Sequence, residues 1–308
     1  MPLCSFQIPL VFHPIYSELD LPVRHRFPIE KYRCLYQYLL QQGVSQRLFQ
    51  QPEPADTQML QRLLDNEYLH ALIGNTLDDK AMRRIGFPWS EQLIKRTLTA
   101  VGGTLLTAKL ALEHDVAINL TGGYHHAFND YGSGFCMVND LYVAADQMLQ
   151  HPDINTVLIF DCDVHQGDGT AALAADRSDI ITVSLHCEKN FPYRKQRSDM
   201  DFALDKHMHD DEYLTVVEQA LQLALDYQQI DAVIYDSGVD IHQDDDLGHL
   251  NISTQGIYLR DKAVFNACKQ RRLPVAAVIG GGYQRDIQAL TDVHFQLFKA
   301  AHAVYGRS

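Results

Sequence analysis

The sequence predicts a single α/β domain in which a mostly parallel central sheet carries helices on both faces. Short apolar segments, typical of strands buried on both sides, alternate along the chain with longer segments of helical periodicity. Polar and glycine-rich clusters follow four of the five predicted strands. Because ligands of such sheets bind beyond the carboxyl ends of the strands, this coincidence predicts a functional site at that edge.

Each predicted strand is marked by an apolar run and by the segment that follows it. The first, 116–120, precedes TGGYHH, and the second, 156–160, precedes DCDVHQGDG. The third, 180–185, precedes HCEKNFPY, which is polar but less diagnostic. The fourth, 232–235, precedes DSGVD, and the last, 275–279, precedes GGGY.

The helices are expected where apolar residues recur with helical spacing, over 90–113, 138–150, 211–227, 254–271 and 285–304. The chain contains no internal repeat, low-complexity tract or Ser/Gly linker. The whole chain, residues 1–308, is therefore expected to form one domain.

Composition narrows the class of function. A hydrophobic fraction of 46% and a charged fraction of 21% are ordinary for a globular protein, and no apolar run approaches the ~20 residues of a membrane span. The net charge of -13 argues against nucleic-acid binding and favours cationic or neutral substrates. Six scattered cysteines without a CxxC pair indicate neither a disulfide framework nor a thiolate zinc site, and the first residues lack a basic leader. A cytoplasmic location is expected, whereas the oligomeric state is left open.

The segment DCDVH holds the first candidate metal ligands. Asp161, Asp163 and His165 stand two residues apart, so an extended chain points all three side chains to one face. At that spacing Asp163 and His165 can converge on one ion with bonds of ~2.0 to 2.2 Å. Asp240, after another strand, is the candidate for the third ligand of a catalytic zinc. Such donors also suit Fe²⁺, Co²⁺ or Mn²⁺, and the alternative is a strand end whose carboxylates are hydrated or cap a helix.

The adjacent histidines His125 and His126 follow two glycines at a strand end, and one of them is a candidate general base. Carboxylates at Asp161 and Asp168 are candidates to orient one imidazole each and to raise its pKa, which would separate the protonation states of the two histidines. The alternative is a histidine pair that belongs only to the surface or the core.

Tyr283 ends the GGGY segment, where three glycines remove side-chain bulk and let the tyrosine reach over a pocket. Its hydroxyl is a candidate donor to a developing oxyanion, and the alternative is a tyrosine packed on the next helix. Gly134 with Phe135, and Phe191 before a proline, are candidates for the walls of a narrow channel, although aromatic residues are more often core.

Together TGGYHH, GSGFC, DCDVHQGDG, DSGVD and GGGY, in this order, resemble the zinc-dependent histone deacetylase family, which includes bacterial acetylpolyamine and acetoin-utilisation proteins. The resemblance spans nearly the whole chain and implies one catalytic domain of the arginase/deacetylase-like fold. The segments FHPIYS, HRFPIEKY and DIHQDDDLGHLNIS resemble the class IV branch in particular. Two departures are Tyr124, where many class I members have tryptophan, and the lack of a matching rim aspartate.

The resemblance assigns roles to the candidate residues. It makes His126 the general base and His125 its electrostatic partner, with Tyr283 as the hydrogen-bond donor in the transition state. It places Asp168 behind His126 and Asp161 behind His125, and it implies one zinc ion per chain, held by Asp163, His165 and Asp240. It places Phe135 and Phe191 beside the acyl-lysine channel. It also implies a structural potassium ion, for which the matching residues are Asp161, Asp163, His165, Ser184 and Leu185.

The expected reaction is hydrolysis of the amide of Nε-acyl-lysine, acetyl or longer, by water activated at the metal. The acyl-chain length stays open, and so does the choice between a protein or peptide and an acylated small amine such as an acetylpolyamine. A binuclear ureohydrolase and a catalytically silent acyl-binding module are the remaining alternatives. Metal stoichiometry distinguishes the first of these, and turnover distinguishes the second.

Overall fold

The computed structural model describes residues 3–306 and gathers the strands of this range into one sheet. The strands are β1 (Leu10–Val11), β2 (Phe49–Gln50), β3 (Val116–Asn119), β4 (Val157–Asp161), β5 (Ile180–Cys187), β6 (Met200–Leu204), β7 (Ala232–Asp236) and β8 (Val275–Val278). Their order is β2-β1-β3-β8-β7-β4-β5-β6, and every neighbouring pair is parallel. The predicted fold class is confirmed.

Both faces of the central strands are buried. On β4, Leu158 and Phe160 pack in one apolar cluster, while Val157 and Ile159 pack in another. Residues of β7 and β8 divide between the same two clusters in the same alternating way. A strand covered on both sides has no polar face, which explains why the central strands are continuous apolar runs in the sequence.

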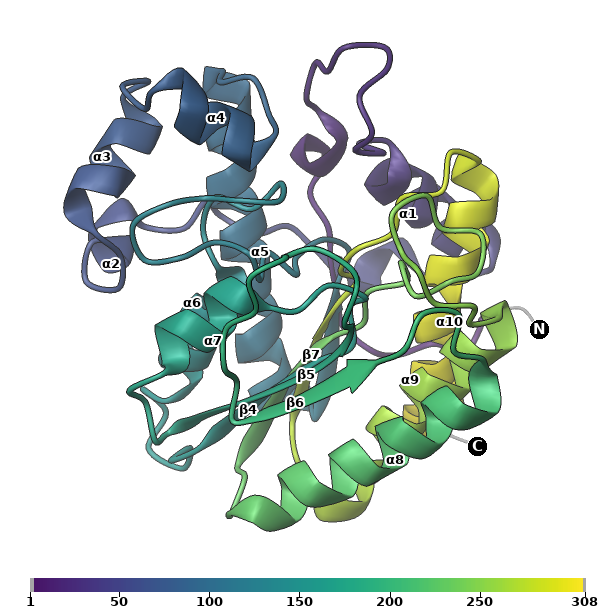
Figure 1. Cartoon of the computed structure of the whole chain (residues 1–308). Helices are drawn as coiled ribbons and strands as arrows, with labels where there is room; N and C mark the ends of the chain where they lie inside the picture. Colours follow the sequence, from purple (N-terminus) through teal and green to yellow (C-terminus); the bar gives the residue numbers. More distant parts are fainter. Residues whose placement is uncertain (1–2, 307–308) are drawn as a thin grey trace.

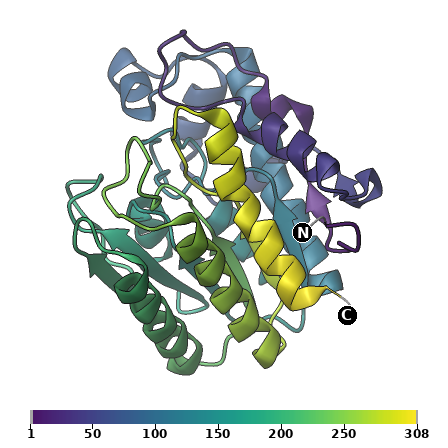
Figure 2. The ribbon, with the colours of Figure 1, turned by 90° about the vertical axis from the view of Figure 1, so that its right-hand side faces the viewer.

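α-Helices cover both faces of the sheet, and a group of short ones lies to one side of it (Figure 1). The α-helices are α1 (Lys31–Gln41), α2 (Thr57–Leu60), α3 (Asn66–Ile73), α4 (Asp79–Ile85), α5 (Glu91–His114), α6 (Asp140–Met148), α7 (Asp168–Ala174), α8 (Asp210–Tyr227), α9 (Thr254–Arg271) and α10 (Ile287–Tyr305). Helices α8, α9 and α10 lie side by side over one face (Figure 2), and α5, α6 and α7 lie over the other (Figure 1). Within residues 3–306 no helix has both the length and the apolarity needed to cross a membrane.

The five predicted strands and five predicted helices all occur, with ends shifted by at most two residues. The elements that sequence reasoning missed are short or partly exposed. β1 and β2 have two residues each, too few to show a periodicity. β6 lies at the edge of the sheet and alternates between half-buried and exposed residues before the buried Leu204, so it is not an apolar run. The helices α1 to α4 and α7 were not predicted either.

Candidate active site

Three donor atoms converge beyond the carboxyl ends of β4 and β7. Nδ1 of His165 lies 2.9 Å from Oδ1 of Asp163 and 3.1 Å from Oδ2 of Asp240. The three residues are buried, and their donor atoms lie within 4.8 Å of one another. Bonds of about 2.0 to 2.1 Å to a tetrahedral ion place ligand atoms about 3.4 Å apart, so a small outward shift admits the ion. The structure thus brings together the three residues predicted as metal ligands, Asp163, His165 and Asp240, which we call the donor cluster.

Backbone N–H groups hold both carboxylates, and Oδ1 of Asp163, the oxygen that faces the His165 ring, accepts the His165 N–H at 2.9 Å. Oδ2 of Asp163 accepts the Gly281 N–H at 2.9 Å, and Oδ1 of Asp240 accepts the Val164 N–H at 2.9 Å. A Cβ on Gly281 would lie 2.2 Å from Asp240 and 2.3 Å from Asp163, so only glycine allows the backbone this close. The glycines after β8 therefore support the donor cluster as well as carrying Tyr283.

The donor cluster holds more negative charge than its buried position tolerates. Burial, together with the Asp163 carboxylate, raises the pKa of Asp240 to about 7. Burial alone would lower the pKa of His165, but its hydrogen bonds to Asp163 and Asp240 raise it to about 10. Without a metal ion, a proton on His165 therefore offsets part of the negative charge of Asp163 and Asp240. A divalent ion bound at the same place would neutralise both carboxylates. Two carboxylate oxygens and one imidazole nitrogen fit zinc or a similar divalent metal.

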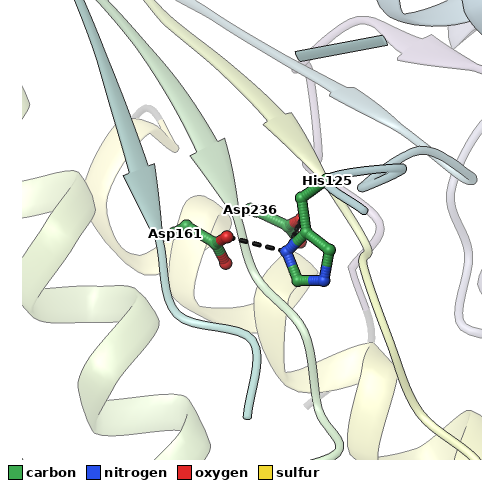
Figure 3. Close-up of side chains that lie close together, drawn as sticks. All are labelled: His125, Asp161 and Asp236. Carbon is green, nitrogen blue, oxygen red and sulfur yellow. Dashed lines mark hydrogen bonds and ion pairs between the residues drawn. The ribbon is translucent and has the colours of Figure 1, made fainter. Parts of the chain in front are cut away.

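Two buried carboxylates lie near the Nδ1 atom of His125 (Figure 3). Its Nδ1 is 2.7 Å from Oδ2 of Asp161 and 3.9 Å from Oδ2 of Asp236. Burial alone would lower the pKa of His125, but Asp161 and Asp163 hold it well above its usual value. The imidazole is therefore charged, and its predicted pairing with Asp161 is present.

His126 has the opposite protonation state. Its Nδ1 is 2.6 Å from Oδ1 of Asp168, the first residue of α7. Burial and the charge on the neighbouring His125 lower the pKa of His126 to about 4. With Nδ1 bound to Asp168, a neutral His126 presents Nε2 as a proton acceptor. The two adjacent histidines are thus separated into a charged and a neutral member. The expectation that Asp168 would raise the pKa of His126 was wrong, because burial and the charge on His125 outweigh this carboxylate.

A cavity of about 420 Å³ opens onto these groups and contains all three predicted wall residues, Gly134, Phe135 and Phe191. The Phe191 ring stands edge-on to His126 at 4.8 Å between centroids, and the Phe135 ring lies 6.0 Å from that of Tyr283. Gly134 has a φ of +53°, and a Cβ there would lie 2.6 Å from the His126 ring. The glycine therefore keeps the wall close to the histidine without a clash.

Tyr283 lines the same cavity, with its ring 6.4 Å from that of His165. Its backbone N–H donates to Oδ2 of Asp245 at 2.7 Å, which fixes the start of the segment after the glycines. Burial and the carboxylates of Asp163 and Asp240 raise the pKa of Tyr283 well above its usual value. The phenol therefore stays protonated and remains a hydrogen-bond donor.

The residues predicted for potassium lie at the end of β4, just beyond it, and on the neighbouring strand β5. Ser184 on β5 is in register with Asp161 on β4, and Leu185 follows it. Asp163 and His165 continue from β4. The hydroxyl of Ser184 lies 3.0 Å from Nδ1 of His186.

Lys31, at the start of α1, is a residue of the site that sequence reasoning missed. It is 1% exposed, and its ammonium group donates to the carbonyls of Gly280 at 3.0 Å and Gly282 at 3.4 Å. Burial lowers the pKa of Lys31 to about 8. The lysine joins α1 to the glycine segment that supports the donor cluster. The one available signal was its place in HRFPIEKY, which contributed only to the resemblance.

Replacing Lys31 with methionine is expected to lower turnover by about 10- to 100-fold, because a support of the metal ligands is lost. Two buried carbonyls would also lose their donor, at a cost of about 1 to 3 kcal/mol in the free energy of unfolding. Steady-state kinetics and urea unfolding measure the two effects. Lys109→Met, at a lysine 72% exposed, is the control. Turnover at the level of the control would remove Lys31 from the support of the site.

Arg260 on α9 was also missed, because arginine in a helix is usually solvent-exposed. It is fully buried and donates to the carbonyls of Gly238 at 2.6 Å and Ser237 at 2.9 Å. It also pairs with Asp261, whose carboxylate accepts the Tyr235 hydroxyl at 2.7 Å. This buried ion pair holds the backbone of the segment that leads to Asp240.

Arg260→Met is expected to lower the free energy of unfolding by about 3 to 5 kcal/mol, because Asp261 is left as an uncompensated buried charge. Urea denaturation monitored by circular dichroism provides the measurement. Adding Asp261→Asn should recover part of the loss, since the stranded charge is removed. A single variant within about 1 kcal/mol of wild type would show that the ion pair does not stabilise the fold.

Asp236, at the end of β7, is buried, and neither of its carboxyl oxygens has a hydrogen-bond partner among residues 3–306. Burial, and then the nearby Asp161 carboxylate, raise its pKa well above the usual range. The sequence marked it only as the first residue of DSGVD. It is a neutral carboxyl group beside the charged His125 (Figure 3).

A family model, the histone deacetylase domain, matches residues 25–298. The chain belongs to the histone deacetylase family. The resemblance inferred from the ordered motifs is thereby confirmed, and membership of the family indicates a hydrolase of the deacetylase type.

Relatives in this family differ in how much of their length they share with the chain. An uncharacterized protein of Picosynechococcus sp. is 47% identical over 298 residues, which are 96% of this chain and 99% of that one. Histone deacetylase 2 of Arabidopsis thaliana is 36% identical over 60% of this chain. The acetoin utilization protein AcuC of Bacillus subtilis is 33% identical over 59% of it. These matches span 49% and 51% of the two named relatives, about half of each.

A solved structure supports the fold. A histone deacetylase homologue from Aquifex aeolicus superposes with a TM-score of 0.81 at 21% sequence identity, covering 98% of this chain and 85% of that one. The predicted deacetylase-like fold is confirmed.

Proposed function

We propose that this histone deacetylase relative hydrolyses the amide of Nε-acyl-lysine, acetyl or longer fatty acyl, in a protein or peptide. The observation that carries the proposal is the convergence of the donor cluster, a neutral His126 and the protonated Tyr283 on one cavity. The aromatic walls of that cavity suit an extended acyl-lysine side chain. A binding module would not need a base and an oxyanion donor at the same place.

The chain's own groups supply the proton transfers. His126 accepts a proton from the attacking water at Nε2 and later donates it to the departing lysine nitrogen. The Tyr283 hydroxyl donates a hydrogen bond to the acyl oxygen as negative charge develops there. A divalent ion bound by the donor cluster, zinc or alternatively Fe²⁺ or Co²⁺, supplies Lewis acidity that polarises the carbonyl and acidifies water. The amide and one water give lysine and a carboxylate.

The remaining roles extend the same proposal. Asp168 holds the tautomer of His126, and Asp161 holds His125 as a charged neighbour that stabilises the developing anion. Gly134, Phe135 and Phe191 guide the acyl-lysine. A structural potassium ion binds at Asp161, Asp163, His165, Ser184 and Leu185. We also assign the chain to the class IV branch, as a single catalytic domain over residues 1–308 that acts in the cytoplasm.

The test is hydrolysis of a panel of acyl-lysine peptides from acetyl to myristoyl, with a chelator and with each metal added back. We expect turnover that the chelator abolishes and one added metal restores, and the preferred chain length identifies the acyl specificity. Hydrolysis of acetylated polyamines but of no peptide would move the substrate to a small amine. Silence on both would support the binding module.

One observation bears on the alternative that the protein is a binuclear ureohydrolase, which binds two metal ions. His125, Asp161 and Asp236 make a second buried group with metal-ligand spacing, next to the donor cluster. We expect one divalent metal ion per chain, because Asp161 already bonds the His125 ring. Analysis of divalent metals after gel filtration decides between the deacylase and the ureohydrolase: a ratio near two divalent ions per chain would favour the ureohydrolase.

A further inference from the structure

We propose that the substrate carries negative charge next to its acylated amine, so that the acyl-lysine is flanked by acidic residues. This inference rests on the proposed function and adds its substrate class. Two adjoining cavities, of about 420 and 690 Å³, share Arg26, Asp246, Leu247 and Tyr283. The smaller contains His126 and His165, so the larger extends its mouth on the Tyr283 side.

Cations dominate the lining of this mouth. Across the two cavities, Asp246 is the one carboxylate in the lining formed by the described residues, and it is paired with Arg285. The other cations in the lining are Arg24, Arg26, Arg84 and Lys189. The whole chain has 39 acidic and 26 basic residues, so the sign of the charge is reversed at the mouth. The preference for cationic or neutral substrates that net charge suggested does not follow from the local charges.

The cations without a counter-ion are exposed. Within residues 3–306, Arg24, Arg26 and Lys189 have no carboxylate oxygen within 4.0 Å. Their side chains are therefore available to a ligand. Unpaired cations at a concave site attract anions and raise their local concentration.

Each cation is attached to an element that walls the channel. Arg26 precedes Phe27, whose ring is 5.3 Å from that of Phe135. Lys189 stands two residues before Phe191. These positions keep the charges beside the entry, where they meet the residues that flank an inserted acyl-lysine.

Arg84 is held in place on the same wall. Its guanidinium lies 4.0 Å over the Tyr131 ring, and its Nε donates to the Gly132 carbonyl at 3.2 Å. Its own carbonyl accepts the Gly134 N–H at 3.2 Å. These contacts hold the Arg84 side chain in one position. Less side-chain entropy is therefore lost when its remaining N–H groups bind a carboxylate.

The test uses acetyl-lysine peptides that differ only in the two flanking residues, which are Glu, Gln or Lys. We expect the Glu peptide to have a KM about 10-fold below that of the Gln peptide at low salt, with the Lys peptide weaker still. Raising the ionic strength should shrink these ratios, because the charges are solvent-exposed. kcat should vary much less than KM, since the cations do not touch the reacting atoms.

The matched variants are Arg26→Gln with Lys189→Gln, against Lys109→Gln on α5 as a control for the loss of a remote surface charge. The double variant should lose most of the preference for Glu over Gln, while the control keeps it. Equal KM values for the Glu and Gln peptides in the wild-type protein, or the same preference in the double variant, would overturn the inference.

Binding of the same peptides, followed by fluorescence anisotropy, separates this inference from the proposed function. Tighter binding of the Glu peptide without hydrolysis of any peptide would refute the hydrolase and keep the charge preference. Hydrolysis of the Glu, Gln and Lys peptides with equal KM values would support the hydrolase and refute the charge preference. Tighter binding of acetylated polyamines than of the Glu peptide would overturn the inference, because polycations should be repelled from this mouth.

Discussion

Tyr283→Phe is expected to lower kcat by about 10²- to 10³-fold while KM changes by less than about threefold. The phenol is kept protonated by burial and by Asp163 and Asp240, so it is a donor throughout the neutral pH range. Its hydrogen bond gains strength as the acyl oxygen becomes anionic, so its loss affects the transition state more than the bound substrate. Phenylalanine retains the ring that packs against Phe135.

Steady-state kinetics on an acetyl-lysine peptide, with thermal unfolding of each variant, measure this effect. Tyr227→Phe removes a hydroxyl from a residue 60% exposed on α8 and is expected to behave as wild type. Equal losses in kcat/KM and in binding would assign Tyr283 to substrate binding. A large fall in the unfolding temperature would mean that the ring supports the fold.

Asp240→Asn is expected to lower zinc affinity and turnover by at least about 100-fold, because an amide is a poor replacement for a carboxylate ligand. The side chain keeps its shape, and its Oδ1 can still accept the Val164 N–H. The metal-free variant should be as stable as the metal-free wild type or more stable, because a buried carboxylate beside Asp163 has been neutralised. Affinity for the metal and stability of the apoprotein therefore move in opposite directions.

Metal content after dialysis, turnover and unfolding of the apoprotein are the three measurements. The control is Asp244→Asn in the same loop, where the carboxylate is 69% exposed. A variant that retained one ion per chain and wild-type turnover would exclude Asp240 from the ligand set. Destabilisation of the apoprotein would show that the carboxylate stabilises the fold without metal.

The parts of the fold and the site that could be predicted are those marked by a short stretch of sequence, such as an apolar run or a polar segment directly after it. The strands β3, β4, β7 and β8 are apolar runs because both faces of the sheet are covered, and the residues after them meet at one edge. Asp163 and His165 are two residues apart, and an extended chain was expected to bring them together. β4 instead ends at Asp161, and the two residues meet in the turn that follows, where the His165 N–H donates to Oδ1 of Asp163 at 2.9 Å. Asp240 lies far from these two residues in the sequence. It was predicted as the third ligand because the segment DSGVD, which it ends, follows another predicted strand.

The unpredicted part depends on contacts between distant segments. Lys31 lies 249 residues from Gly280, and nothing in the local pattern distinguishes it from a surface lysine. Arg260 and Asp236 likewise acquire their roles only when the strands assemble. The charge reversal at the channel mouth joins residues from the loop before α1, the end of α4 and the loop after β5, and total composition has the opposite sign. Net charge describes the whole surface, whereas recognition depends on one part of it.

The place of β8 has a consequence for how the protein is made. It is the last strand in the chain, yet in the sheet it lies between β3 and β7 and joins the two sides. Until residues 275–278 have left the ribosome, β1 to β3 and β4 to β7 share no strand pairing. The glycines and Tyr283 that complete the site follow directly after this strand. A nascent chain that already contains the histidines and the donor cluster therefore closes its sheet and completes its candidate site in the same late step of synthesis.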